Sequence, residues 1–139
     1  MVYLKRKDIY FPELSYKLNG LFFKVGKEMG KFRSERQYCD YIAELLNENE
    51  IKFIREKDLK NIFNNIELKG NIPDFIVDNS IIVDAKHKAF LTKNDYYQMM
   101  RYLEIANLPL GILVNFRAHH ISPKRIINPN FSSHSGNNL

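Results

Sequence analysis

Residues 72–88, IPDFIVDNSIIVDAKHK, constrain the fold of this chain more than any other stretch of its sequence. Two short apolar runs, 75–77 and 81–83, flank the polar residues 78–80, a pattern typical of two β-strands joined by a tight turn. Charged side chains lie at the end of this hairpin away from the turn. Because charges are costly in a half-buried sheet unless something pairs or uses them, these residues require an explanation.

The register of the hairpin decides where its two aspartates point. If residues 78–80 form a three-residue loop, Val77 lies opposite Ile81, and Asp74 lies opposite Asp84 on the same face of the sheet. A two-residue loop would place the two aspartates on opposite faces. The apolar pattern favours the three-residue loop, because that register gathers the apolar side chains on one face.

Two carboxylates opposed across paired strands repel each other, and a cation between them would relieve the repulsion. Oxygen ligands of this kind suit Mg²⁺ or Mn²⁺, which leave positions for water and a substrate phosphate. Lys86 follows Asp84 by two residues on the same face and could reach a phosphate or an attacking water, as phosphodiester hydrolysis requires. The alternative is that Asp74 and Asp84 are solvated strand-end residues, with Lys86 paired to one of them.

Two further polar residues could join this site from predicted helices. Glu35 opens the helix predicted over 34–48 and lies three residues before Tyr38, so we expect it on the core-facing side. It could be a metal ligand, although a first-turn carboxylate is also favoured by the helix dipole. Gln98, in the helix predicted over 92–106, could orient water or phosphate. A surface glutamine is the simpler interpretation.

The remaining pattern predicts an α/β fold with a mixed β-sheet flanked by helices. Helical spacing of apolar residues predicts a first helix over 11–29, and a continuous apolar run at 111–116 predicts a central strand. Weaker strand signals occur at 51–56, 61–68 and 124–128, the second of them ambiguous. We expect residues 1–127 to form one domain and the polar tail, 128–139, to be disordered.

Composition sets limits on the cellular setting and the partners. The net charge of +5 favours a polyanionic partner such as nucleic acid, although a soluble domain that happens to be basic fits equally well. Cys39 is the only cysteine, so the chain can form no internal disulfide and no cysteine zinc cluster. We interpret Cys39 as a core residue and expect a reducing, cytoplasmic location. No apolar run is long enough to span a membrane.

A group of basic residues near the C-terminal strands, together with two lysines that follow the hairpin, could line a groove for a polyanion, although a solvated charged surface explains them equally well. Three of the four histidines are interpreted as surface or phosphate-contact residues, since two of them are adjacent and would point apart on a strand. The residues concerned are Lys88, Lys93, Arg117, Lys124 and Arg125, with His87, His119 and His120.

Taken together, these motifs resemble the PD-(D/E)XK nuclease superfamily and, within it, the GxxExxY family. The resemblance covers roughly Leu14 to Ile127. It is carried by the stretches LSYKLNGLFFKVGKEMG, SERQY, IPDFIVDNSIIVDAK, YYQMMRYL and LGILVNF. One departure is clear: Phe32 stands at the position of the name-giving glycine, while Gly30 fits the turn that ends the first helix.

The resemblance implies a divalent-metal-dependent nuclease with a restriction-endonuclease-like core and a four-stranded mixed sheet. Asp74, Asp84 and the Ala85 carbonyl would ligate Mg²⁺ or Mn²⁺, and Glu35 would add a ligand or hold a metal-bound water. Lys86 would position the nucleophilic water, supported by Gln98. DNA is expected as substrate more than RNA. The alternative is an inactive nucleic-acid-binding or protein-interaction module. A homodimer is a further expectation, for which the sequence shows no interface.

Overall fold

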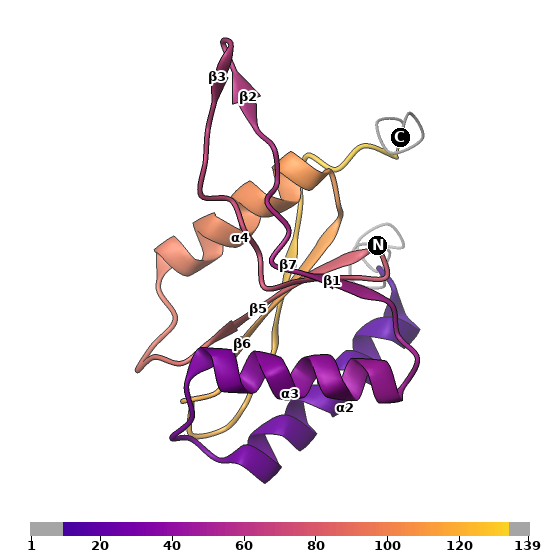
Figure 1. Cartoon of the computed structure of the whole chain (residues 1–139), viewed down its shortest axis with the longest axis vertical. Helices are drawn as coiled ribbons and strands as arrows, with labels where there is room; N and C mark the ends of the chain where they lie inside the picture. Colours follow the sequence, from indigo (N-terminus) through magenta and orange to yellow (C-terminus); the bar gives the residue numbers. More distant parts are fainter. Residues whose placement is uncertain (1–9, 134–139) are drawn as a thin grey trace, which may run out of the picture.

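A computed structural model describes residues 10–133 of the chain (Figure 1). A five-stranded sheet with strand order β1-β4-β5-β6-β7 forms its centre, and a separate two-stranded hairpin pairs β2 with β3. The helices are α2 (Pro12–Met29), α3 (Glu35–Glu48) and α4 (Lys93–Ala106). The strands are β1 (Phe53–Arg55), β2 (Ile62–Phe63), β3 (Ile66–Glu67), β4 (Phe75–Val77), β5 (Ile81–Lys86), β6 (Leu110–Asn115) and β7 (Lys124–Ile127).

The sheet is mixed, as the sequence predicted. β5 and β6 are parallel and are connected through α4, while the other neighbouring strands are antiparallel. Parallel strands need such a crossover, whereas antiparallel strands can be joined by a tight turn. The expected four strands are one too few, because β1 adds an edge strand by pairing with β4.

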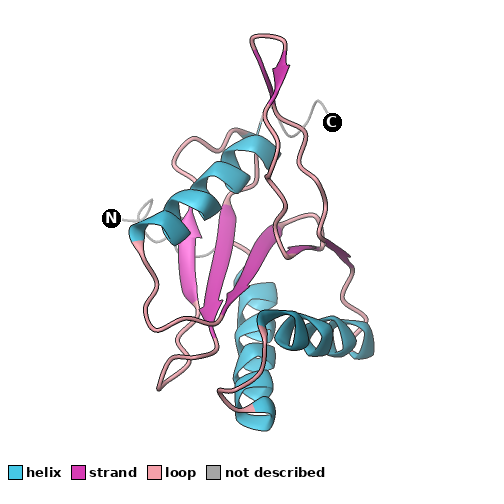
Figure 2. Ribbon diagram, turned by 60° about the vertical axis from the view of Figure 1, so that its left-hand side comes forward, coloured by secondary structure: helices cyan, strands magenta, loops and turns pink. Residues whose placement is uncertain are grey.

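Helices cover both faces of the sheet (Figure 2). Helices α2 and α3 pack on one face through buried side chains that include Phe22, Tyr38 and Val83. Helix α4 packs on the other face, where Met99 and Leu103 are among the residues buried with strand side chains. The hairpin therefore has two buried faces instead of the single apolar face expected, because α4 lies over the side that carries Asp84.

Local sequence signals account for where the helices begin and how closely they pack. Ser34 and Gln37 form a capping box at the start of α3, with hydrogen bonds of 2.9 and 3.2 Å. A second capping box, Thr92 with Asp95, begins α4. At Gly111 in β6, an added Cβ would lie 2.4 Å from the sulfur of Met99. Glycine at this position therefore allows α4 to pack closely on the sheet.

The ambiguous segment at 61–68 forms the β2–β3 hairpin, which projects away from the body of the fold at the top of Figure 1. Ile62, Phe63 and Ile66 on this hairpin are all more than 60% exposed. Two strands alone cannot bury both of their faces. This hairpin is therefore an exposed apolar projection.

The described part of the polar C-terminal segment is attached to the fold. Asn128 is buried, and its side-chain amide donates to the carbonyls of Leu103 and Leu108, each at 3.2 Å. The Ser132 N–H donates to the side chain of Asn107 at 3.2 Å. The tail for which we expected disorder, 128–139, also includes residues 134–139, which lie outside the described residues. None of the described helices is long and apolar enough to cross a membrane.

Candidate active site

The register of the β4–β5 hairpin places the two aspartates of the motif opposite each other. Val77 pairs with Ile81 across a three-residue turn, which confirms the register predicted from the apolar pattern. Asp78 and Asn79 in the turn have φ values of 50° and 51°, a left-handed conformation in which Asp and Asn are enriched among non-glycine residues. The turn sequence and the apolar alternation therefore specify the same register.

The side chains of Asp74 and Asp84 each accept a hydrogen bond from the backbone of the opposite arm of the hairpin. The Asp74 N–H donates to Asp84 Oδ1 at 2.9 Å, and the Ala85 N–H donates to Asp74 Oδ2 at 2.8 Å. Each carboxylate thus has one oxygen fixed by the backbone of the opposite arm. Within residues 10–133, no hydrogen bond occupies Asp74 Oδ1, and Asp84 Oδ2 lies 3.6 Å from Lys86 Nζ. One oxygen of each aspartate remains available to a ligand.

Burial makes this pair electrostatically unfavourable when both groups are ionised. Asp84 is only 4% exposed, and Asp74 is half-buried. Burial, reinforced by the charge of Asp74, raises the pKa of Asp84 to about 7. Burial likewise raises the pKa of Asp74, although the Ala85 N–H and Lys86 partly oppose this. The alternative of two solvated strand-end aspartates is therefore wrong for Asp84.

Lys86 lies beside the aspartates and is held by α4. Its ammonium donates to Gln98 Oε1 at 2.7 Å and lies 3.6 Å from Asp84 Oδ2. The predicted surface position of Gln98 is therefore only partly right: the residue is half-buried and contacts the motif lysine. Helix α4 thus fixes the ammonium next to the carboxylates instead of leaving it to move in solvent.

Glu35 reaches the same end of β5 from the other layer. Its Oε2 accepts a hydrogen bond of 3.1 Å from the N–H of His87, the residue after the end of β5. Glu35 is exposed, so the expected core-facing position is wrong: as the first residue of α3 it overhangs the edge of the sheet. In the described part of the chain, no three Asp, Glu, His or Cys side chains are grouped closely enough to hold a metal ion.

The loop before Glu35 is held by Tyr38, one helical turn later. The buried Tyr38 hydroxyl donates to the Gly30 carbonyl at 2.6 Å and accepts from the Arg33 N–H at 3.3 Å. Its ring stacks on Phe116, with 4.6 Å between centroids. The hydroxyl contacts give the E-x-x-Y spacing a structural reason, because Tyr38 fixes the turn that directly precedes Glu35.

Gly30 has a φ of 75°, the left-handed region that favours glycine, and it ends α2. Phe32, which stands where the family's glycine is expected, is 98% exposed. The turn therefore uses the glycine two residues earlier.

Two residues with structural roles at the site were missed or misread in the sequence. Asn115 ends β6, and its side chain accepts from the N–H groups of Lys88 and Arg117 and donates to the Lys88 carbonyl. A polar residue within the apolar run 111–116 was the available signal. His87 was interpreted as a surface or phosphate-contact residue, but its ring contacts the Lys31 carbonyl and stacks on Tyr38. The core position predicted for Cys39 is confirmed.

The donor set fits a small divalent cation. The buried Asp84 and the half-buried Asp74 both have raised pKa values, and each has an oxygen free of backbone contacts, so together they form a local excess of negative charge when ionised. Mg²⁺ is commonly bound by one or two carboxylates, with waters and substrate oxygens as its other ligands. The pair Asp74 and Asp84 can thus hold such an ion without a third carboxylate.

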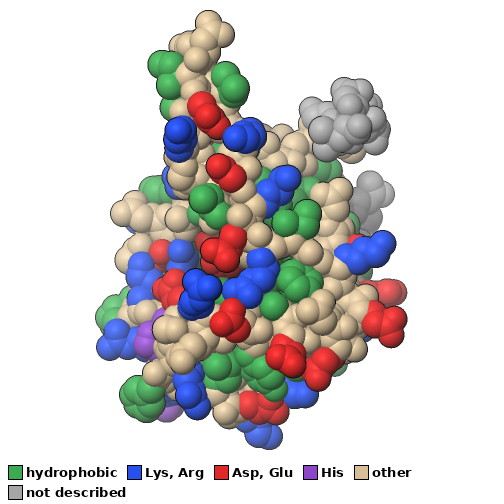
Figure 3. Space-filling model, in the orientation of Figure 1, with side chains coloured by type: hydrophobic (Ala, Val, Ile, Leu, Met, Phe, Trp, Pro, Cys, Tyr) green, Lys and Arg blue, Asp and Glu red, His purple; other side chains and the backbone are tan. Residues whose placement is uncertain are grey.

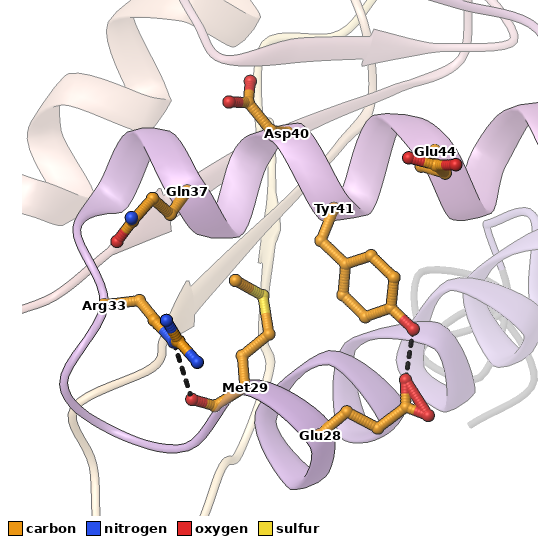
Figure 4. A pocket seen from close by; sticks show the side chains of 7 residues that line it. All are labelled: Glu28, Met29, Arg33, Gln37, Asp40, Tyr41 and Glu44. Carbon is orange, nitrogen blue, oxygen red and sulfur yellow. Dashed lines mark hydrogen bonds between the residues drawn. The ribbon is translucent and has the colours of Figure 1, made fainter.

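A hollow between α2 and α3 has the wrong charge for a phosphate site (Figure 4). Glu28, Asp40 and Glu44 line it together with Arg33, whose guanidinium donates to a backbone carbonyl at 3.4 Å. The Tyr41 hydroxyl is hydrogen-bonded to Glu28. Acidic and basic side chains are also interspersed over the face drawn in Figure 3. The overall positive charge therefore forms no uniform basic surface on that face.

Comparison with known protein families identifies the chain. A family model described as the PD-(D/E)XK nuclease superfamily matches residues 12–126. The chain belongs to the PD-(D/E)XK nuclease superfamily. Its mixed sheet and flanking helices are the restriction-endonuclease-like fold expected from the sequence.

A solved structure supports the fold of this PD-(D/E)XK protein. The chain is similar to the crystal structure of SSO0001, with a TM-score of 0.55 and 21% sequence identity over 70% of its length. It spans 50% of the SSO0001 chain. A search of curated proteins found no match.

Proposed function

We propose that this PD-(D/E)XK protein is a divalent-metal-dependent nuclease that hydrolyses phosphodiester bonds, in DNA more than in RNA. The carrying observation is the reciprocal anchoring of Asp74 and Asp84, with the Lys86 ammonium 3.6 Å from Asp84 Oδ2. A purely structural hairpin gains nothing from a buried carboxylate, Asp84, whose pKa is raised by its own burial and by the charge of Asp74. In a metal-assisted hydrolase, two carboxylates would hold the ion and a fixed ammonium beside them would stabilise negative charge on the phosphate.

Asp74 and Asp84 would hold Mg²⁺ or Mn²⁺ together with the carbonyl of Ala85. When bound, the ion supplies a Lewis acid for the phosphate and lowers the pKa of a coordinated water. The Asp74 N–H and Ala85 N–H keep the two carboxylates in place throughout. Burial raises the pKa of Asp84 to about 7, so a cation at this site would favour the ionised form of Asp84 at neutral pH.

Lys86 positions the attacking water and stabilises the negative charge that develops on the phosphate oxygens. Gln98 accepts one of its three ammonium hydrogens at 2.7 Å, which fixes the direction of the other two. Glu35, held by the His87 N–H, faces the same end of β5 and would hold a water bound to the ion. These groups are therefore in place before substrate binds, which is the arrangement that electrostatic catalysis favours.

The finer predictions from the sequence are part of this proposal. Within the superfamily we assign the chain to the GxxExxY family, on the Glu35 and Tyr38 spacing and the contact of Tyr38 with Gly30. We also keep the cytoplasmic location and the single domain over residues 1–127. An inactive module is disfavoured because every polar position of the motif is filled.

A homodimer would use the β2–β3 hairpin. Its exposed Ile62, Phe63 and Ile66 form an apolar projection. Segment 56–72 contains three lysines and three acidic residues, so a second copy would meet no net charge. Sedimentation of wild type and Phe63→Glu across a concentration series tests this: a concentration-dependent dimer that Phe63→Glu abolishes supports it. Monomers at all concentrations would refute it.

The nuclease function is tested by incubating the protein with single-stranded, duplex and branched DNA and with RNA, each with Mg²⁺, Mn²⁺ or chelator. We expect metal-dependent cleavage that Asp84→Ala abolishes and that Lys86→Met slows by at least 100-fold. Lys52→Met is the matched control, because Lys52 contacts the hairpin turn at the opposite end of β4 and β5. Cleavage that survives Asp84→Ala, or absence of cleavage of every substrate with either ion, would refute the proposal.

A further inference from the structure

A hollow of about 290 Å³ lies beside the candidate active site, and the proposed function does not use it. It is bordered by the loop after β5, the start of α4 and the loop before β7. Aromatic and basic side chains line it, and we call it the aromatic hollow: Phe90, Tyr96, Asn115, His120, Ser122 and Lys124. Phe90 is 79% exposed, so the face of its ring is accessible to a ligand.

The sheet register places this hollow next to the two aspartates. Asp84 pairs with Leu113 on β6, and Leu113 pairs with Lys124 on β7. Leu113 and Ile126 pack with α4, so Lys124, two residues before Ile126, points to that same side of the sheet as Asp84. Two strand spacings of about 4.8 Å put the Cα atoms of Asp84 and Lys124 roughly 10 Å apart. That distance is about three stacked nucleotides at ~3.4 Å each.

The loop that carries Phe90 is held in place before any ligand binds. The Asn115 side chain holds the backbone of Lys88 through two hydrogen bonds, accepting from its N–H at 3.1 Å and donating to its carbonyl at 2.8 Å. The Lys88 ammonium forms an ion pair of 3.0 Å with Asp95 in the first turn of α4. The Thr92 N–H also donates a hydrogen bond to Asp95. Both ends of the loop from Lys88 to Thr92 are therefore held by contacts with the rest of the fold. Little ordering entropy remains to be lost when a ligand binds.

We propose that the aromatic hollow binds one unpaired nucleobase, from a nucleotide a few positions away from the cleaved phosphate. This inference rests on the nuclease function proposed above. Aromatic side chains stack on the face of any base, and Lys124 at the rim suits the neighbouring phosphate. Bases inside a duplex are stacked and paired, so their faces are not accessible. The hollow therefore selects substrates with single-stranded character at this position.

Binding of oligonucleotides measured by fluorescence anisotropy tests the proposal. Asp84→Asn serves as the parent protein so that binding is measured without cleavage. Stacking contributes about 1–3 kcal/mol per base, so we expect Phe90→Ala to weaken binding of a labelled oligothymidylate by about 5- to 150-fold. Duplex binding should change less than twofold. Tyr16→Ala, which removes an aromatic ring that is 81% exposed on α2, is the matched control and should have no effect.

A second arm locates the base. Single abasic positions are moved along the oligothymidylate, and one position should weaken binding to the parent but not to Phe90→Ala. Oligouridylate in place of oligothymidylate distinguishes RNA from DNA, and the same Phe90 dependence on either chain supports the hollow. Equal binding by the parent and Phe90→Ala, or an equal loss on duplex and single strand, would overturn it.

The two proposals fail separately. Wild-type cleavage with no effect of Phe90→Ala on binding would overturn the aromatic hollow and leave the nuclease function standing. Single-strand binding that depends on Phe90, without cleavage under any ion, would overturn the nuclease function and support the hollow in a binding module.

Discussion

Replacing Asp84 by Asn tests the electrostatic argument at its centre. The amide keeps an oxygen that can accept the Asp74 N–H and has nearly the same shape, but it carries no charge. The difference between a pKa of about 7 in the folded protein and the ordinary value of 3.8 corresponds to about 4 kcal/mol of destabilisation when Asp84 is ionised. This is an upper limit for the gain from Asp84→Asn.

The net gain is smaller, because the new amide NH₂ faces the Lys86 ammonium, which lies 3.6 Å from Oδ2 in the wild type. Without divalent ions at pH 8, we expect Asp84→Asn to raise the free energy of unfolding by about 1–2 kcal/mol. For a chain of this size, that corresponds to a Tm increase of about 3–8 °C.

The pH dependence has a definite sign. Between pH 4 and pH 7, the folded wild type keeps a proton on Asp84 that the unfolded chain has lost, so its stability decreases as pH rises through this range. Asp84→Asn lacks this contribution. The two proteins should therefore be close in stability near pH 4 and diverge up to about pH 7.

Urea or thermal denaturation over pH 4–8, in chelator and then in millimolar Mn²⁺, provides the measurement. The ion should stabilise wild type at pH 8 and do little for Asp84→Asn, because one carboxylate ligand is lost. If Asp84→Asn is less stable than wild type at pH 8 in chelator, or if Mn²⁺ stabilises both proteins equally, the argument from repulsion between carboxylates is wrong.

Two further predictions concern the Glu35 side of the site. Tyr38→Phe removes the hydroxyl that donates to the Gly30 carbonyl at 2.6 Å, so we expect the free energy of unfolding, measured by urea denaturation, to fall by about 1–2 kcal/mol and cleavage to become slower. Tyr41→Phe is the control: the Tyr41 hydroxyl is hydrogen-bonded to the exposed Glu28, so the stability should hardly change. Glu35→Gln keeps an acceptor for the His87 N–H, so stability should change by less than about 0.5 kcal/mol, while Mn²⁺ affinity from calorimetric titration falls about 10-fold or more. Unchanged Mn²⁺ affinity and cleavage rate in Glu35→Gln would show that this carboxylate has no part in binding the ion.

The sequence predicted those features that depend on neighbours in the chain. Apolar alternation and the polar residues 78–80 gave the register of β4 and β5, and with it the meeting of Asp74 and Asp84. Ser34 with Gln37 and Thr92 with Asp95 marked the starts of α3 and α4. These signals are readable because strand alternation and helix capping act over a few residues.

Tertiary packing decided the features that depend on distant residues. Burial of Asp84 follows from α4 lying across its face of the sheet, and the contact of Lys86 with Gln98 comes from the same packing. Glu35 was expected to face the core by helical spacing, but the crossing of α3 over the end of β5 leaves it exposed and bonded to His87. The periodicity of apolar residues predicts which face of a helix is buried, but it does not predict where the end of the helix lies relative to the sheet. The chain's local pattern therefore established the carboxylate pair, while the packing of helices on both faces set its burial, its raised pKa and its neighbours.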